Sequence, residues 1–218
     1  MNQTLWIATR KGLFSARSSG GGGSGSQSTS DQTNWKLDER ISFLGEPVSA
    51  VLVDKRPLAR GEPAALYAAL RLGHFGCKLH VSRDDGASWT ELAVPVYPPK
   101  PAEAKQANGE PDTNSWTLDT IWTLETGGPD QPGRLWAGTV PGGLFKSDDA
   151  GLSWQLVDSL WNTPERPQWF GGGYDQPGVH SVCVDPRDSR ALLIAVSCGG
   201  VWRSSDDGAS WRLTGEGQ

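Results

Sequence analysis

The residues best suited to bind a ligand lie in one stretch that mixes aromatic side chains, an arginine and a run of glycines. Over 161–174 the chain reads WNTPERPQWFGGGY, which carries Trp161, Arg166 and Trp169. Aromatic faces beside a guanidinium suit stacking on a sugar or planar ligand and pairing with a carboxylate. The alternative is that the two tryptophans pin a long loop onto the fold, because aromatic residues are often packing residues. The stretch predicts a binding surface, with packing as the competing interpretation.

Histidines and arginines elsewhere extend this set. His74 lies in the segment GHFG over 73–76, and Arg10 and Arg71 each follow an apolar run. His180 begins another apolar run, where a hydrogen-bonded structural histidine is the alternative to a catalytic one. The candidate ligand-binding residues are therefore Arg10, Arg71, His74, Trp161, Arg166, Trp169 and His180.

Acidic residues near these candidates bear on catalysis. Glycoside hydrolysis generally needs a pair of carboxyl groups that flank the scissile bond. The spacing along the chain pairs none of the available acids, so no catalytic residue is assigned. The acids considered are Glu39, Glu46, Asp119, Glu165 and Asp175.

A recurring octapeptide organises the elements that must position these side chains. SRDDGASW over 82–89, SDDAGLSW over 147–154 and SSDDGASW over 204–211 all read S-x-D-x-G-x-x-W. Recurrence of this kind indicates a repeat protein. Glycine permits a tight turn, the aspartate accepts hydrogen bonds from turn amides, and the tryptophan buries its indole. Paired aspartates could alternatively bind a cation, but we expect a hydrogen-bonded hairpin turn and no metal.

Aligned on the octapeptides, the chain repeats a unit of four short strands, the last beginning at the tryptophan. Such units are typical of propeller blades. We therefore predict an all-β fold, a β-propeller of four-stranded antiparallel blades in a single domain over 1–218. The expected first strands are 47–54, 117–126 and 179–185, the second 5–9, 66–70, 135–139 and 192–196, and the third 13–16, 78–81, 144–146 and 201–203.

The octapeptide resembles the Asp-box, or BNR repeat, of sialidases, sortilin-type receptors, xyloglucanases and uncharacterised bacterial glycosyl-hydrolase-like propellers. The resemblance covers most of the chain and implies that the boxes face away from any active site. The candidate residues and the long insertions 94–115 and 159–178 would share the opposite rim, where concave polar surfaces bind ligands. Sialidases carry an Arg-Ile-Pro motif and a three-arginine clamp. Here residues 40–42 read RIS, so the resemblance does not extend to sialidase activity.

Composition excludes several functions. A net charge of −5 gives no reason to expect nucleic acid or an anionic membrane as a partner. No run is apolar enough to span a bilayer and no leader is visible, so we expect a cytoplasmic protein. Cys77, Cys183 and Cys198 fit no disulfide framework, and Cys77 with His80 lacks a second pair for zinc. We expect no cofactor.

The first blade and the chain ends are irregular. A Gly/Ser-rich stretch over 18–33 replaces the first octapeptide. We interpret it as a flexible insertion in a surface turn, with an engineered linker as the alternative. The chain starts at a second strand and stops after a fourth, so we expect a C-terminally truncated ring with about four blades present.

These observations leave three hypotheses for the function. The first is a cytoplasmic propeller whose rim binds a small molecule, glycan or protein partner. The second is a glycosidase-like hydrolase that uses rim carboxylates. The third is an assembly factor or scaffold, because one fold hosts many functions.

Overall fold

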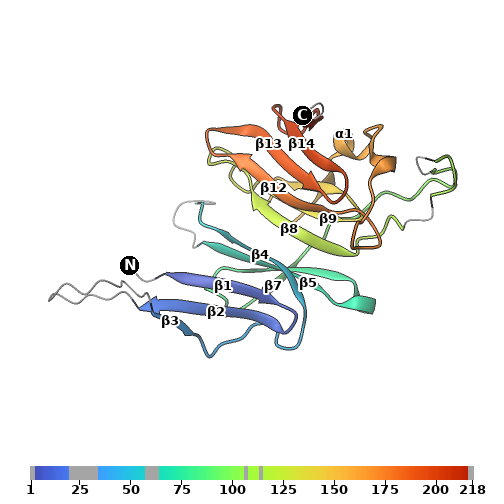
Figure 1. The fold of residues 1–218 in the computed structure, drawn as a ribbon. Helices are drawn as coiled ribbons and strands as arrows, with labels where there is room; N and C mark the ends of the chain where they lie inside the picture. Colours follow the sequence, from blue (N-terminus) through green and yellow to red (C-terminus); the bar gives the residue numbers. More distant parts are fainter. Residues whose placement is uncertain (1–2, 20–33, 57–63, 106–107, 113–114, 216–218) are drawn as a thin grey trace.

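The computed structural model describes residues 3–19, 34–56, 64–105, 108–112 and 115–215. It is all-β, and its sheets follow one another along the chain as the blades of a partial β-propeller (Figure 1). Among the described residues, no helix is long and apolar enough to cross a membrane. No described group of three or more acidic, histidine or cysteine side chains could hold a metal ion.

Each blade is an antiparallel sheet whose strands lie in chain order. Blades 2 to 4 have four strands, and blade 1 has three. Blade 1 comprises β1 (Thr4–Thr9), β2 (Gly12–Ser19) and β3 (Asn34–Leu37); blade 2 comprises β4 (Val48–Asp54), β5 (Ala65–Arg71), β6 (Cys77–Ser82) and β7 (Thr90–Leu92); blade 3 comprises β8 (Thr120–Thr126), β9 (Leu135–Val140), β10 (Leu144–Ser147) and β11 (Gln155–Leu156); blade 4 comprises β12 (Val179–Asp185), β13 (Asp188–Val196), β14 (Gly200–Ser204) and β15 (Arg212–Thr214).

The strands confirm the predicted template, with two shifted starts. β13 begins at Asp188, earlier than expected, because the β12–β13 ladder runs on to the pair Asp185–Asp188 at a tight hairpin. The Asp185 carboxylate accepts the Arg187 amide in that turn at 2.9 Å. β8 begins at Thr120 rather than at 117. Short helical turns cover Gly73–Phe75, α1 (Asp158–Trp161) and Arg166–Gln168.

Within the described ranges blade 1 has no inner strand before β1, as the sequence predicted. Its β2–β3 ladder places Ser18 opposite Trp35. The register of β6 and β7, extended one residue past Val81–Thr90, likewise places Ser82 opposite Trp89. Blade 1 therefore keeps the first and last positions of the octapeptide. The intervening residues 20–33, most of the predicted Gly/Ser insertion, lie outside the described part of the chain.

The octapeptides form identical turns. In the first copy, the buried Ser82 hydroxyl accepts the Gly86 amide at 2.9 Å. Asp84 accepts the Ser88 amide at 2.8 Å and its hydroxyl at 2.6 Å. Asp85 and Gly86 both have positive φ, which is the type I′ geometry that favours Asp-Gly. The other copies repeat these bonds at Ser147, Asp149, Gly151 and Ser153, and at Ser204, Asp206, Gly208 and Ser210.

Alternating strand residues build the core between blades. On β5, Leu66, Ala68 and Leu70 pack toward blade 1, while Tyr67 and Ala69 pack toward blade 3. This follows from the two-residue period of a strand, because both faces of an inner blade are covered. A further cluster joins blades 3 and 4. The blades are therefore held together face to face by apolar side chains.

The outward face of blade 4 is uncovered in this structure. The ladders place Leu66, Leu135 and Leu192 opposite the first serines of their octapeptides, so Tyr67, Trp136 and Leu193 are equivalent. Tyr67 and Trp136 are 0% exposed, whereas Leu193 is 45% exposed. Blade 3 covers Tyr67 and blade 4 covers Trp136, whereas no described blade covers Leu193.

Candidate functional site

Three side chains from distant segments meet at the rim. Arg71 ends β5, Asp119 directly precedes β8, and Tyr174 lies in the loop before β12. Arg71 Nη2 donates to Asp119 Oδ1 at 2.9 Å, and Tyr174 Oη donates to Asp119 Oδ2 at 2.6 Å. The Arg71 guanidinium also lies 5.7 Å from the Tyr174 ring centroid. We call this set the rim cluster.

The rim cluster fixes the protonation state of its phenol. Burial raises the pKa of Tyr174 to about 12, with further contributions from its hydrogen bond to Asp119 and from the Asp119 charge. Tyr174 is thus a neutral donor at physiological pH. The hydrogen bond to Asp119 also raises the pKa of Arg71, which keeps its charge. The cluster offers both donors and acceptors to a polar ligand.

Glycines explain how the loop places Tyr174. A Cβ at position 171 would collide with the Tyr174 carbonyl, so only glycine allows this tight turn. A Cβ at position 178 would collide with the Trp122 ring, which therefore packs against bare backbone. Trp122 in turn lies 5.6 Å from the Tyr174 ring. Gly171 and Gly178 thus allow Trp122 to pack against the Tyr174 ring of the rim cluster.

An open hollow lies beside the rim cluster. Its volume is about 350 Å³, and its walls include Arg71, Asp119, Tyr174 and Asp175. Arg71 and Asp119 are partly exposed, with 48% and 39% of their side chains accessible. Two predicted acids, Asp119 and Asp175, therefore line the same hollow.

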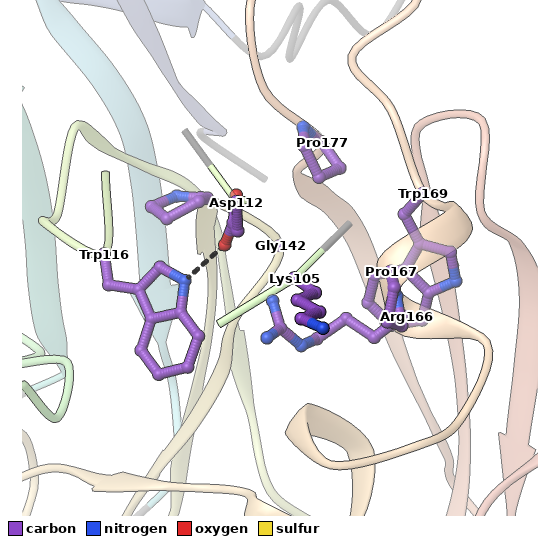
Figure 2. A pocket seen from close by; sticks show the side chains of 9 residues that line it. Lys105, Asp112, Trp116, Gly142, Arg166, Pro167, Trp169 and Pro177 are labelled. Atoms are coloured by element: carbon purple, nitrogen blue, oxygen red, sulfur yellow. Dashed lines mark hydrogen bonds between the residues drawn. The ribbon is translucent and has the colours of Figure 1, made fainter. Parts of the chain in front are cut away.

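A second, smaller cavity of about 40 Å³ adjoins it, and Arg166 lines its wall (Figure 2). The guanidinium carbon lies 3.8 Å from the Trp161 ring centroid and 5.1 Å from that of Trp116. The Trp116 indole donates to Asp112 at 3.1 Å, as the dashed line marks. Burial lowers the pKa of Arg166, because the charged form loses its hydration.

The two predicted loop tryptophans are buried in different core clusters. Trp161 is 4% exposed and packs against Tyr97 at 5.0 Å. Trp169 is 7% exposed and packs against Trp202 at 5.6 Å. This burial favours the packing interpretation for both rings. Trp161 still contributes to the smaller cavity indirectly, because the Arg166 guanidinium stacks on its ring.

The remaining candidates are spread over the surface. His180 is exposed, bonds to Ser181 and lies 6.1 Å from the Trp122 ring. Arg10 and His74 are exposed, and neither has a side-chain partner within the described part of the chain. Arg71 and Arg166 line different cavities and do not form a common clamp.

The other acids do not join the rim cluster. Glu39 lines a separate hollow together with Asp85 of an octapeptide, so it is not a rim acid. Glu165 accepts the hydroxyl of Thr163. Glu46 is exposed. Sequence reasoning missed Trp122 and left Tyr174 out of the candidates, although both aromatics lie in segments it had marked.

Together, the fold and the rim hollow define a β-propeller with an open cavity between its loops. An oligoxyloglucan-reducing end-specific xyloglucanase from Emericella nidulans is 28% identical over 207 residues, covering 93% of this chain and 22% of that protein. A xyloglucanase from a Paenibacillus species is 33% identical over 104 residues, covering 45% of this chain and 10% of that protein. No model of a protein family matches the chain.

Among solved structures, a GH74 xyloglucanase from Xanthomonas campestris matches 95% of this chain and 27% of its own, with a TM-score of 0.54 at 14% identity. That likeness concerns the fold. The chain spans well under half the length of each of these proteins. The chain is a β-propeller whose sequence is similar to part of these xyloglucanases, and this similarity favours the second hypothesis over the first.

Proposed function

We propose that this propeller binds a glycan in the rim hollow. The observation that carries the proposal is the rim cluster: Arg71, Asp119 and Tyr174 present a cation, a carboxylate and a neutral phenol to one open hollow of about 350 Å³. Sugar hydroxyls both donate and accept hydrogen bonds, so a mixed set of donors and acceptors fits them. The similarity to xyloglucanases supports a glucan backbone as the first ligand to test.

Calorimetric titration with xyloglucan oligosaccharides tests the proposal. Tyr174→Phe keeps the ring but removes the hydroxyl, and Arg71→Gln removes the charge. We expect each change to weaken binding at least tenfold, since a hydrogen bond to a charged group contributes roughly 1.5–3 kcal/mol. Arg190→Gln is the matched control, because Arg190 is also paired with an aspartate but lies on blade 4, outside the hollow. Undiminished affinity in both rim variants would contradict the proposal.

Glycoside hydrolysis is the second candidate, favoured by the presence of Asp119 and Asp175 in one hollow. Asp119 accepts hydrogen bonds on both oxygens, which fixes its orientation for a nucleophile or base. Asp175 lines the same hollow and is the second carboxyl group that glycoside hydrolysis requires. Release of reducing ends from xyloglucan should then fall at least 100-fold in Asp119→Asn and in Asp175→Asn, the order expected for losing acid–base catalysis. Binding without turnover in the unaltered chain would leave only the glycan-binding role.

A further inference from the structure

Arg166 is held in place by aromatic rings rather than by an ion pair. Its guanidinium lies against two indole faces, at 3.8 Å from Trp161 and 5.1 Å from Trp116. Within the described residues it makes no ion pair and no side-chain hydrogen bond. Stacking on aromatic faces offsets part of the cost of removing this cation from water. It leaves the N–H groups at the edge of the guanidinium plane available to an acceptor.

The charges around the cavity favour an anion. Its charged lining residues are Lys105, Arg166 and Asp112, two cations and one acid. The acid, Asp112, accepts the Trp116 indole at 3.1 Å, lies 3.8 Å from Lys100 Nζ and also acts on Arg166 through its charge. Figure 2 shows Arg166 extending across the cavity toward Trp116, with Lys105 beside it. The lining therefore presents a net positive charge to an incoming anion.

The size and walls of the cavity limit what can enter. Its volume of about 40 Å³ is small, given that one water needs on the order of 10–15 Å³ by a comparable measure. A group of two or three heavy atoms therefore fits, and a sugar ring does not. Pro141, Pro167 and Pro177 line the cavity, and their rings make its walls stiff. A planar carboxylate matches both this size and the fork of a guanidinium.

We propose that Arg166, stacked on Trp161 and Trp116 and assisted by Lys105, is a binding site for a carboxylate group. Burial lowers the pKa of Arg166 more than the Asp112 charge raises it, so a further anion would stabilise the charged form. The site itself does not depend on the proposed glycan-binding function.

The position of the cavity indicates which carboxylates to test. Residues adjacent in sequence line the cavity and the rim hollow: Trp116 lies between Ser115 and Thr117, and Val140 directly precedes Pro141. A sugar held in the hollow could thus place an attached carboxylate at Arg166. If the proposed function holds, the ligand class narrows to acidic glycans, with glucuronate as the simplest probe.

Titration at constant ionic strength separates the alternatives. Sodium glucuronate, sodium acetate and neutral glucose are added while tryptophan fluorescence reports on Trp116 and Trp161. We expect saturable changes with both carboxylates. Arg166→Gln should raise the Kd for glucuronate at least tenfold, the effect of losing about 1.4 kcal/mol. Arg166→Lys should be intermediate, because it keeps the charge without the fork.

Matched variants keep the inference falsifiable. Lys105 is exposed, so Lys105→Gln should fold normally and still raise the Kd about two- to fivefold, as expected for a partly screened charge. Arg190→Gln should leave the Kd unchanged. No saturable response to either carboxylate, or an unchanged Kd in both Arg166 variants, overturns the site. Acetate should bind whether or not neutral glycans do, so its result is independent of the rim hollow. If the unaltered protein bound acetate and glucuronate but no neutral glycan, the proposed function would be contradicted and the carboxylate site would not.

Discussion

Tyr174 donates its phenolic hydrogen to Asp119 over 2.6 Å, across 55 residues of sequence. The bond joins the loop before blade 4 to the segment that enters blade 3, while Arg71 on blade 2 holds the other oxygen of the same carboxylate. One carboxylate thus connects three blades at the rim. The rim cluster is both a candidate binding site and a link between blades. Measurements of ligand affinity and of stability distinguish these two roles.

Removing the Tyr174 hydroxyl tests how much its hydrogen bond to Asp119 contributes to stability. We expect Tyr174→Phe to lower the free energy of unfolding by about 0.5–1.5 kcal/mol, the net contribution of a typical hydrogen bond. Urea unfolding followed by tryptophan fluorescence measures it. A loss above about 3 kcal/mol would mean that the ring as well as the hydroxyl had been displaced.

Truncating the buried loop tryptophans should mainly affect stability. Trp161 and Trp169 are nearly inaccessible, so we expect each change to alanine to destabilise the protein by about 3–5 kcal/mol. Trp35, which is 45% exposed, is the control and should cost far less when changed to alanine. If the double variant kept its melting temperature but lost ligand binding, the packing interpretation would be wrong.

The octapeptide aspartate should contribute modestly. In Asp149→Ala the amide and hydroxyl of Ser153 and the hydroxyl of Ser147 lose their acceptor. The Ser153 donors are near solvent but Ser147 is buried, so we expect a loss of about 1–3 kcal/mol, the range for unsatisfied groups. Ligand binding should be unchanged, because the turn lies away from the rim. Thermal unfolding of Asp149→Ala beside Asp149→Asn, which keeps one acceptor oxygen, checks this.

Acid should weaken these turns together. Hydrogen bonds from Ser88 and Ser210 lower the pKa of Asp84 and of Asp206 to about 2, below the ordinary value of 3.8. A carboxyl group with a depressed folded-state pKa stabilises the fold above its unfolded pKa, and that contribution is lost as the pH falls through the folded value. We therefore expect the urea midpoint to decline between about pH 4 and pH 2. A flatter decline in Asp84→Asn would support the assignment, and an unaltered profile would contradict it.

The uncovered faces of the end blades should promote association. Leu193 and Val201 are 45% and 42% exposed on blade 4, and Leu5 and Leu37 are 50% and 54% exposed on blade 1. Exposed apolar patches of this kind mark interaction surfaces. We expect light scattering to detect self-association of the 218-residue chain, reduced by Leu193→Lys. A strictly monomeric chain at high concentration would show that these faces do not pair.

The sequence predicted the blades well because their determinants are local. The octapeptide specifies its own turn through the buried Ser82, the acceptor Asp84 and the positive φ of Gly86, and strand alternation then follows. The site was less predictable, because it depends on contacts between distant segments. Nothing near Arg71 in the chain indicates Asp119 as its partner, and nothing near Trp169 indicates that its ring turns inward onto Trp202. The sequence shows glycine at 171 and 178, but it does not show the close contacts with the Tyr174 carbonyl and the Trp122 ring that require glycine there.

The seating of each octapeptide on the preceding blade makes this molecule a nearest-neighbour array. Tyr67 of blade 2 donates to the Ala150 carbonyl in the turn of blade 3, and Gly208 of blade 4 approaches Trp136 of blade 3. In such an array each blade is stabilised by its interfaces with adjacent blades, so the unfolding of one blade directly destabilises only its neighbours. The inner blades, covered on both faces, should exchange their amide hydrogens most slowly. Local unfolding of this chain should begin at blades 1 and 4 and proceed to blades 2 and 3.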